Sequence, residues 1–195
     1  MDTDFRALWD VATPYHQFVR EADANHDLWT GMQRIARIPD WAVDAVRSTG
    51  KAFNFLVIAE DWCGDGTSTI PYLAKLAALS RSIEIRVLPR DQYPEVMDQY
   101  RTAGARAIPI VIVLSQGFEE IGHWGPRPAA LREWLQQTRA TTPQANLYPR
   151  IRRWYAQDKG MSTLQEVLAL LEQKPSAVSR QRSVTANSLM VVPDG

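Results

Sequence analysis

The sequence predicts an α/β fold in which a central mixed sheet is flanked by helices. Two continuous apolar runs of strand length, at 53–59 and 110–114, are typical of central strands that are covered on both faces. Helical periodicity lies before, between and after these runs, so strands and helices alternate. The chain has 195 residues, 45% of them apolar, which is enough for one domain of ordinary size with extensions.

The first fifty residues are predicted to form helices, because apolar residues recur at helical spacing in 5–12, 28–35 and 39–46. Thr13-Pro14 has the pattern of an N-cap and a helix-starting proline, which predicts another helix running to about Asp23. Four aromatic side chains here should pack onto the central domain or onto a second copy, since each has roughly 150–250 Å² to bury. They are Trp9, Phe18, Trp29 and Trp41.

The middle of the chain is predicted to alternate between strands and helices. Its alternating run IEIRVL indicates a strand, and Gly117 marks the turn of a hairpin. In chain order the predicted elements are strand 53–59, helix 67–80, strand 83–88, short helix 94–100, strand 110–114, strand 118–124 and helix 128–138.

Two further helices are predicted near the C-terminus, at about 145–156 and at 162–173, the second with Ser162 as its cap. The remainder is polar apart from Leu189–Val192 and is interpreted as a tail. The predicted organisation is therefore an N-terminal helical extension packed on the core (1–50), a core (51–141), C-terminal helices (142–173) and a tail (174–195).

The motif EDWCGDG, residues 60–66, holds the only cysteine and lies where a strand should meet a helix. A lone cysteine cannot form an internal disulfide, which fits a reducing compartment and favours the cytoplasm. The acidic N-terminus lacks an apolar signal segment, so secretion is not expected. Charges balance at 22 against 22 and no apolar run has the length of a membrane span, so neither nucleic acid nor membrane is an expected partner.

The order of predicted elements, with Trp62-Cys63-Gly64 at the first strand-to-helix corner, resembles the thioredoxin superfamily over roughly 53–138. Pro71 lies eight residues after the cysteine, where that family has a helix-kinking proline. Ile108-Pro109 matches its cis-proline, and Gly117 and Gly125 follow this proline by eight and sixteen residues, as two family glycines do. The N-terminal helices and the phrase EIGHWGPRP resemble a bacterial thioredoxin-like group. The resemblance implies a cis Ile108–Pro109 bond opposite Cys63.

Two departures from the family pattern argue against classical disulfide reduction. Gly66 stands where the resolving cysteine should be, and Val57 where many thioredoxins bury a carboxylate that helps to move protons. A mixed disulfide on Cys63 could therefore not be resolved within this chain.

The position of Cys63 at a helix N-terminus predicts a lowered thiol pKa, because unpaired N–H groups and the helix dipole favour the thiolate. Arg106, three residues before Pro109, is expected in a loop that faces Cys63 and adds positive charge. Asp65 and Glu60 act on the pKa in the opposite direction, and the sequence does not decide which effect is larger. A helix cap is the favoured role for Asp65, and a packing or docking surface for Trp62.

The sequence leaves two functions open, and with them whether the protein is an enzyme. The first is a monothiol oxidoreductase in which Cys63 attacks a disulfide and an external thiol such as glutathione resolves the intermediate, so that its partners are protein thiols or disulfides and small thiols. The second is a non-catalytic thioredoxin-like module that recognises a protein partner in the cis-proline groove. The resemblance assigns substrate-binding roles to Trp62, Gly64, Asp65, Gly66, Ile108 and Pro109.

No metal site and no cofactor beyond such a thiol are expected, because no His, Cys, Asp and Glu cluster has ligand spacing. His16, His26 and His123 are interpreted as surface or structural residues. The oligomeric state stays open, since a single thiol permits an intermolecular Cys63–Cys63 link and a homodimer.

Overall fold

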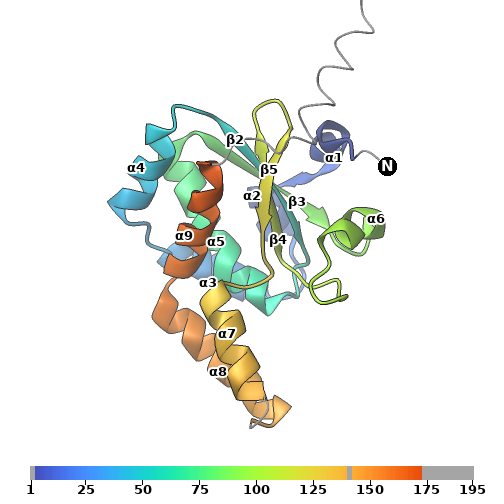
Figure 1. Ribbon diagram of the computed structural model, residues 1–195, viewed down its shortest axis with the longest axis vertical. Helices are drawn as coiled ribbons and strands as arrows, with labels where there is room; N and C mark the ends of the chain where they lie inside the picture. The colour runs from blue at the N-terminus through green and yellow to red at the C-terminus, as the bar shows by residue number, and fades with distance from the viewer. Residues whose placement is uncertain (1–2, 140–141, 173–195) are drawn as a thin grey trace, which may run out of the picture.

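The computed structural model describes residues 3–139 and 142–172. Its described residues contain one mixed sheet of five strands with helices on both sides, which confirms the predicted α/β class (Figure 1). Strands β2 and β3 run parallel, and the other neighbouring pairs are antiparallel. In spatial order the strands are β1 (Thr13–Pro14), β3 (Ile83–Pro89), β2 (Phe53–Ala59), β4 (Ile110–Ser115) and β5 (Glu120–Trp124).

The helices form three groups according to the apolar cluster that each joins. The largest cluster covers one face of the sheet with α2 (Tyr15–Glu21), α3 (His26–Ile35), α4 (Asp40–Ser48), α5 (Gly64–Ser80) and α9 (Met161–Leu171). The opposite face carries α1 (Phe5–Val11), α6 (Pro94–Met97) and a 3-10 turn at Asp98–Tyr100. Helices α7 (Ala129–Arg139) and α8 (Gln144–Asp158) share a third cluster and extend away from the sheet (Figure 1).

Strand β2 lies in the middle of the sheet because both of its faces are apolar. Phe55 and Val57 enter the largest cluster, whereas Leu56 and Ile58 enter the cluster on the opposite face. All four side chains are fully buried, as expected for a strand covered on both sides. This burial fixes the end of β2, and with it the starting point of the segment that carries the cysteine.

The structure of the N-terminal region departs from two of the predictions. Thr13-Pro14 does not cap and start a helix; it forms the short edge strand β1 against Val87 and Arg86, and α2 begins at Tyr15. An edge strand accommodates proline because one side of it needs no N–H donor. Trp9 and Trp29 are buried and Phe18 is partly buried, but Trp41 is 44% exposed, so of its two predicted placements only packing onto a second copy stays open.

Near the C-terminus, Ser162 is not the cap of its helix. Helix α9 begins at Met161 after Gly160, and the Ser162 hydroxyl instead bonds Asp158. Gly160 has a φ of 77°, and an added Cβ would lie 2.4 Å from the Tyr72 ring, so only glycine fits here. The predicted tail, 174–195, and residue 173 at the end of the predicted helix lie outside the described residues.

Candidate functional site

Cys63 occupies the N-cap of α5, just beyond the C-terminal end of β2. Its Sγ accepts a hydrogen bond from the N–H of Gly66 at 3.3 Å and donates its proton to the carbonyl of Ile108 at 3.4 Å. The residue is only 6% exposed and belongs to the apolar cluster that also contains Ile108 and Ile110. The sulfur is thus held between the first turn of the helix and the loop before β4.

The helix N-terminus does not lower the pKa of the Cys63 thiol overall. Burial raises the pKa of Cys63, and the negative charge of Asp65 raises it further. The pKa of Cys63 is lowered by the N–H groups of Gly66 and Asp65 and by the positive charge of Arg127. These effects do not cancel the effect of burial. The S–H bond to Ile108 also uses the proton that a thiolate lacks, so the geometry favours the neutral thiol.

Asp65 is not the helix cap, because Cys63 takes that position. Its carboxylate instead forms an ion pair with Arg127, whose Nε and Nη2 lie 2.9 and 2.6 Å from Oδ2. The hydroxyl of Tyr155 donates to Oδ1 at 2.9 Å. Asp65 thereby joins the first turn of α5 to the segment before α7 and to α8.

Asp61, two residues before the cysteine, holds the N-terminal helices in the same way. Its Oδ2 accepts the N–H groups of Asp23 and Ala24 at 2.9 and 2.8 Å, in the connection between α2 and α3. Its backbone carbonyl accepts the indole N–H of Trp29 at 2.8 Å. The motif around Cys63 is therefore bonded to helices from both ends of the chain.

Trp29 also occupies the space beside Gly66. A Cβ built on Gly66 would lie 3.2 Å from Cη2 of Trp29, closer than ordinary van der Waals contact. The same Cβ would lie 3.5 Å from the Cβ of Cys63, within the range of about 3.5–4.5 Å found in disulfides. The backbone at 63 and 66 thus has the spacing of a dithiol, while a buried indole fills the second position.

Two loops that each contain a cis proline meet next to the sulfur. The Ile108–Pro109 and Gly125–Pro126 bonds are both cis. Gly125 has a φ of 134°, and an added Cβ would lie 2.2 Å from the carbonyl oxygen of Pro109. Only glycine allows this approach, which brings the segment carrying Arg127 against the loop that carries Ile108.

A family model described as thioredoxin matches residues 12–140. The chain belongs to the thioredoxin family. The matched range takes in α2, α3 and α4, so it begins well before the part of the chain in which the sequence resemblance was found. No curated protein matches the chain significantly.

Two solved structures show the same fold as this thioredoxin-like chain. A protein of unknown function from Pseudomonas aeruginosa is 22% identical, with a TM-score of 0.71 over 88% of this chain and 98% of that one. An HIV epitope-scaffold is 20% identical, with a TM-score of 0.69 over 87% of this chain and 98% of that one. At these identities the likeness concerns the fold alone.

Two further residues of the predicted site lie on its surface. Trp62 is 48% exposed, and the guanidinium of Arg90 lies 4.9 Å from the centre of its ring. Gly64 is exposed as the first residue of α5. Arg106, expected to face Cys63, is instead paired with Asp98 at 2.6 Å; the cation that acts on the thiol is Arg127.

The histidines form no cluster with the thiol. His123 contacts Glu120 at 3.2 Å and packs edge-on against Tyr100, whereas His26 lies near Asp27. Among residues 3–139 and 142–172, no group of three or more His, Cys, Asp and Glu side chains is arranged to hold a metal ion. Over the same residues, no helix combines the length and apolar character needed to cross a membrane.

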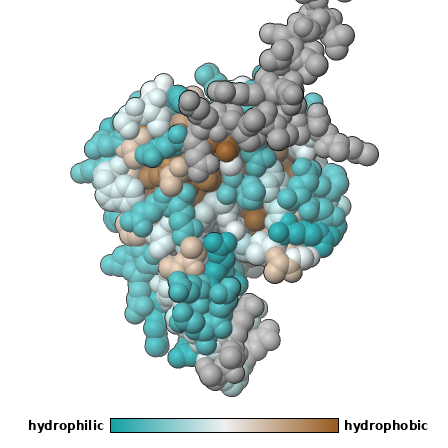
Figure 2. Space-filling model, in the orientation of Figure 1, coloured by the Kyte–Doolittle hydropathy of each residue, from teal (hydrophilic) through white to brown (hydrophobic). Residues whose placement is uncertain are grey.

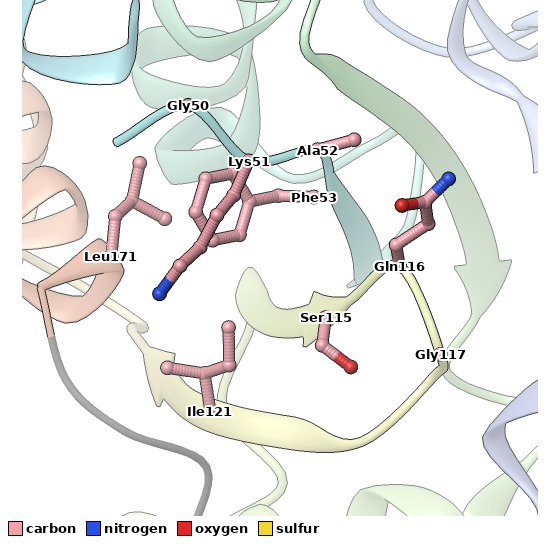
Figure 3. A pocket seen from close by; sticks show the side chains of 9 residues that line it. All are labelled: Gly50, Lys51, Ala52, Phe53, Ser115, Gln116, Gly117, Ile121 and Leu171. Carbon is pink, nitrogen blue, oxygen red and sulfur yellow. The ribbon is translucent and has the colours of Figure 1, made fainter. Parts of the chain in front are cut away.

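A hollow lies at the opposite end of β2 from the cysteine (Figure 3). It contains none of the predicted site residues, so it is separate from the thiol corner. Its lining comes from the start of β2, the turn between β4 and β5, and the end of α9: Gly50, Lys51, Ala52, Phe53, Ser115, Gln116, Gly117, Ile121 and Leu171.

Proposed function

We propose that this protein is a thioredoxin-like binding module, which recognises an extended segment of a protein partner beside Cys63 and Pro109. The observation that carries the proposal is the state of the thiol. Cys63 is buried, its pKa is raised by that burial, and its S–H is bonded to Ile108. A thiol in this state is a poor nucleophile at neutral pH.

The exposed surface next to this thiol supports a docking role. Trp62 presents nearly half of its surface to solvent, and Arg90 lies across its ring. Tryptophan and arginine are the side chains that most often dominate protein interfaces. By contrast, the surface of α7 and α8 in Figure 2 is mostly hydrophilic. Trp62 and Arg90 are therefore the proposed contact for a protein partner.

Monothiol exchange is the second candidate, and one observation favours it. The N–H of Gly66 points at Sγ, and Arg127 acts on the thiol with a positive charge, so a thiolate formed there would be stabilised. In this case Cys63 would attack a disulfide, form a mixed disulfide and release one thiolate; glutathione would then displace Cys63 and complete the exchange. For either candidate we propose a bacterial, cytoplasmic protein that needs no resident cofactor, metal, nucleic acid or membrane.

A displayed library of random peptides separates the two candidates. Peptides selected on the wild type under reducing conditions should bind Cys63→Ser equally well and Trp62→Ala at least tenfold more weakly. Trp41→Ala is the matched control, because it removes a similarly exposed tryptophan from α4, away from the thiol. Binding that needs an oxidised peptide, and that Cys63→Ser abolishes, would contradict the module and favour exchange.

A further inference from the structure

Asp65 is placed to control the thiol rather than only to join helices. It is the second residue of α5, two positions after Cys63, and its side chain is only 14% exposed. Its two oxygens bind Arg127 and Tyr155, which come from segments far away in the sequence. No polar contact of Asp65 is needed to begin the helix, since Cys63 supplies the N-cap.

Three titratable groups surround the sulfur from the elements packed around it. Asp65 lies in α5, Arg127 in the segment before α7, and Tyr155 in α8, while the loop before β4 contributes the carbonyl of Ile108. Tyr155 stays neutral, because burial and the neighbouring Asp65 raise its pKa. The electrostatic balance at Cys63 is therefore between one anion and one cation that are bonded to each other.

The ion pair with Asp65 fixes the direction in which the guanidinium of Arg127 points. Nη2 lies 2.6 Å from the Asp65 carboxylate, so the guanidinium is directed at oxygen rather than at sulfur. Burial alone would lower the pKa of Arg127, but its bond to Asp65 raises the pKa overall and keeps the group charged. Without the carboxylate, the same buried cation would need another anion, and a Cys63 thiolate is one that this corner can form.

We propose that Asp65 is a positioning residue that suppresses the nucleophilicity of Cys63 by holding Arg127 in an ion pair. A neutral residue at position 65 releases Arg127 from this pair, so that its charge stabilises the Cys63 thiolate and makes the thiol more nucleophilic. The inference rests on the proposed function, in which Cys63 is an unreactive thiol in the wild type. The inference adds which residue keeps the Cys63 thiol unreactive and which substitution should increase its reactivity.

Alkylation by iodoacetamide measures the effect. Cys63 releases its proton to solvent, the thiolate sulfur forms a bond to the acetamide methylene, and iodide leaves with the bonding electrons. Asp65→Asn should react about three- to tenfold faster at pH 7, because the gain in thiolate outweighs the loss of intrinsic nucleophilicity. The pH at which the rate is half-maximal should fall as well.

Arg127→Gln tests the other half of the pair and should change the rate in the opposite direction. It leaves the Asp65 charge uncompensated, so Cys63 should react several-fold more slowly than in the wild type, with its pH profile moved upward. Glu60→Gln is the control: it removes a neighbouring carboxylate that bonds the N–H of Asp91, and the rate should not change.

The outcomes separate a positioning role from a merely structural one. If both Asp65→Asn and Arg127→Gln speed alkylation, the ion pair only blocks the access of iodoacetamide to Cys63. That result overturns the inference. An unchanged pH profile in folded Asp65→Asn overturns it too, and Arg127→Gln alone decides if Asp65→Asn does not fold. A different result would contradict the proposed function: iodoacetamide would alkylate Cys63 of the wild type faster than it alkylates free glutathione at pH 7.

Discussion

Two aspartates flank Cys63 at equal distances in the sequence, and they do different work. Asp61 binds neutral backbone N–H groups of the N-terminal helices, whereas Asp65 binds a guanidinium and a phenol from the C-terminal part of the chain. Asp65 lies inside the first turn of α5 and its charge acts on the thiol. The comparison shows that two aspartates in one short motif can have different roles. Asp61 stabilises the packing of the N-terminal helices, whereas Asp65 affects the reactivity of the thiol.

The largest effect is expected from Trp29→Ala, on the side of Asp61. Trp29 is fully buried, donates to the Asp61 carbonyl and packs against Gly66. Its removal should lower the free energy of unfolding by about 3–5 kcal/mol, through lost burial and the cavity that remains. Chemical denaturation measures this. Trp41→Ala, the exposed control, should stay within about 0.5 kcal/mol of the wild type; an equal loss in both variants would contradict the packing described.

A smaller loss of stability is expected from Asp61→Ala. Two backbone N–H groups lose a carboxylate acceptor, which should cost about 2 kcal/mol. The pH profile of Cys63 alkylation should not move, because the charges that act on the thiol are those of Asp65 and Arg127. A profile that shifts as far as it does in Asp65→Asn would remove the distinction between the two aspartates.

The substitution Gly66→Cys tests the corner itself. Its Cβ spacing to Cys63 suits a disulfide, but the new side chain presses on Trp29, so the reduced variant should lose about 1–3 kcal/mol by overpacking. A 63–66 disulfide should form under mild oxidant, with modest reduction of insulin-type disulfides, since Val57 supplies no buried carboxylate. Adding Trp29→Phe should make the disulfide form more readily. Free thiols that persist in both variants would show that the dithiol geometry has been lost.

The smallest effect concerns stability at alkaline pH. The folded protein keeps the Cys63 proton to a higher pH than the unfolded chain, because burial raises the thiol pKa. Above the unfolded value of about 8.5 the folded state binds more protons, so stability falls as pH rises, by at most about 1.4 kcal/mol per pH unit. In denaturation experiments between pH 8 and 9.5 the wild type should lose more stability than Cys63→Ala, since the buried tyrosines whose pKa is also raised contribute equally to both proteins. Parallel curves would contradict it.

Much of the fold follows from the sequence because its signals are local. The apolar runs that became β2 and β4, and the helical stripes around them, depend on residues close together in the chain. The error at Thr13-Pro14 arises because a distant segment competes: these residues pair with β3 instead of starting a helix. The exposure of Trp41 likewise depends on contacts between distant segments. Pattern alone cannot rank such long-range alternatives.

The candidate site was predictable only in part for the same reason. The position of Cys63 at the strand-to-helix corner could be read from the sequence, but the sign of its pKa shift depends on burial. Arg127 stands inside the phrase GPRP that the resemblance singled out, yet no spacing rule links it to Asp65, 62 residues away. Tyr155 is 90 residues away, within the helix predicted at about 145–156, and nothing in its spacing links it to Asp65.

The most direct test of the account is a titration of the Cys63 thiol in the intact wild type, followed by the ultraviolet absorbance of the thiolate with Cys63→Ser as blank. The account predicts a midpoint above the ordinary value of about 8.5 for a free cysteine. It also predicts that the midpoint falls in Asp65→Asn and stays in Asp61→Ala. A wild-type midpoint at or below about pH 7 would show that the corner holds a ready thiolate, and would contradict the account.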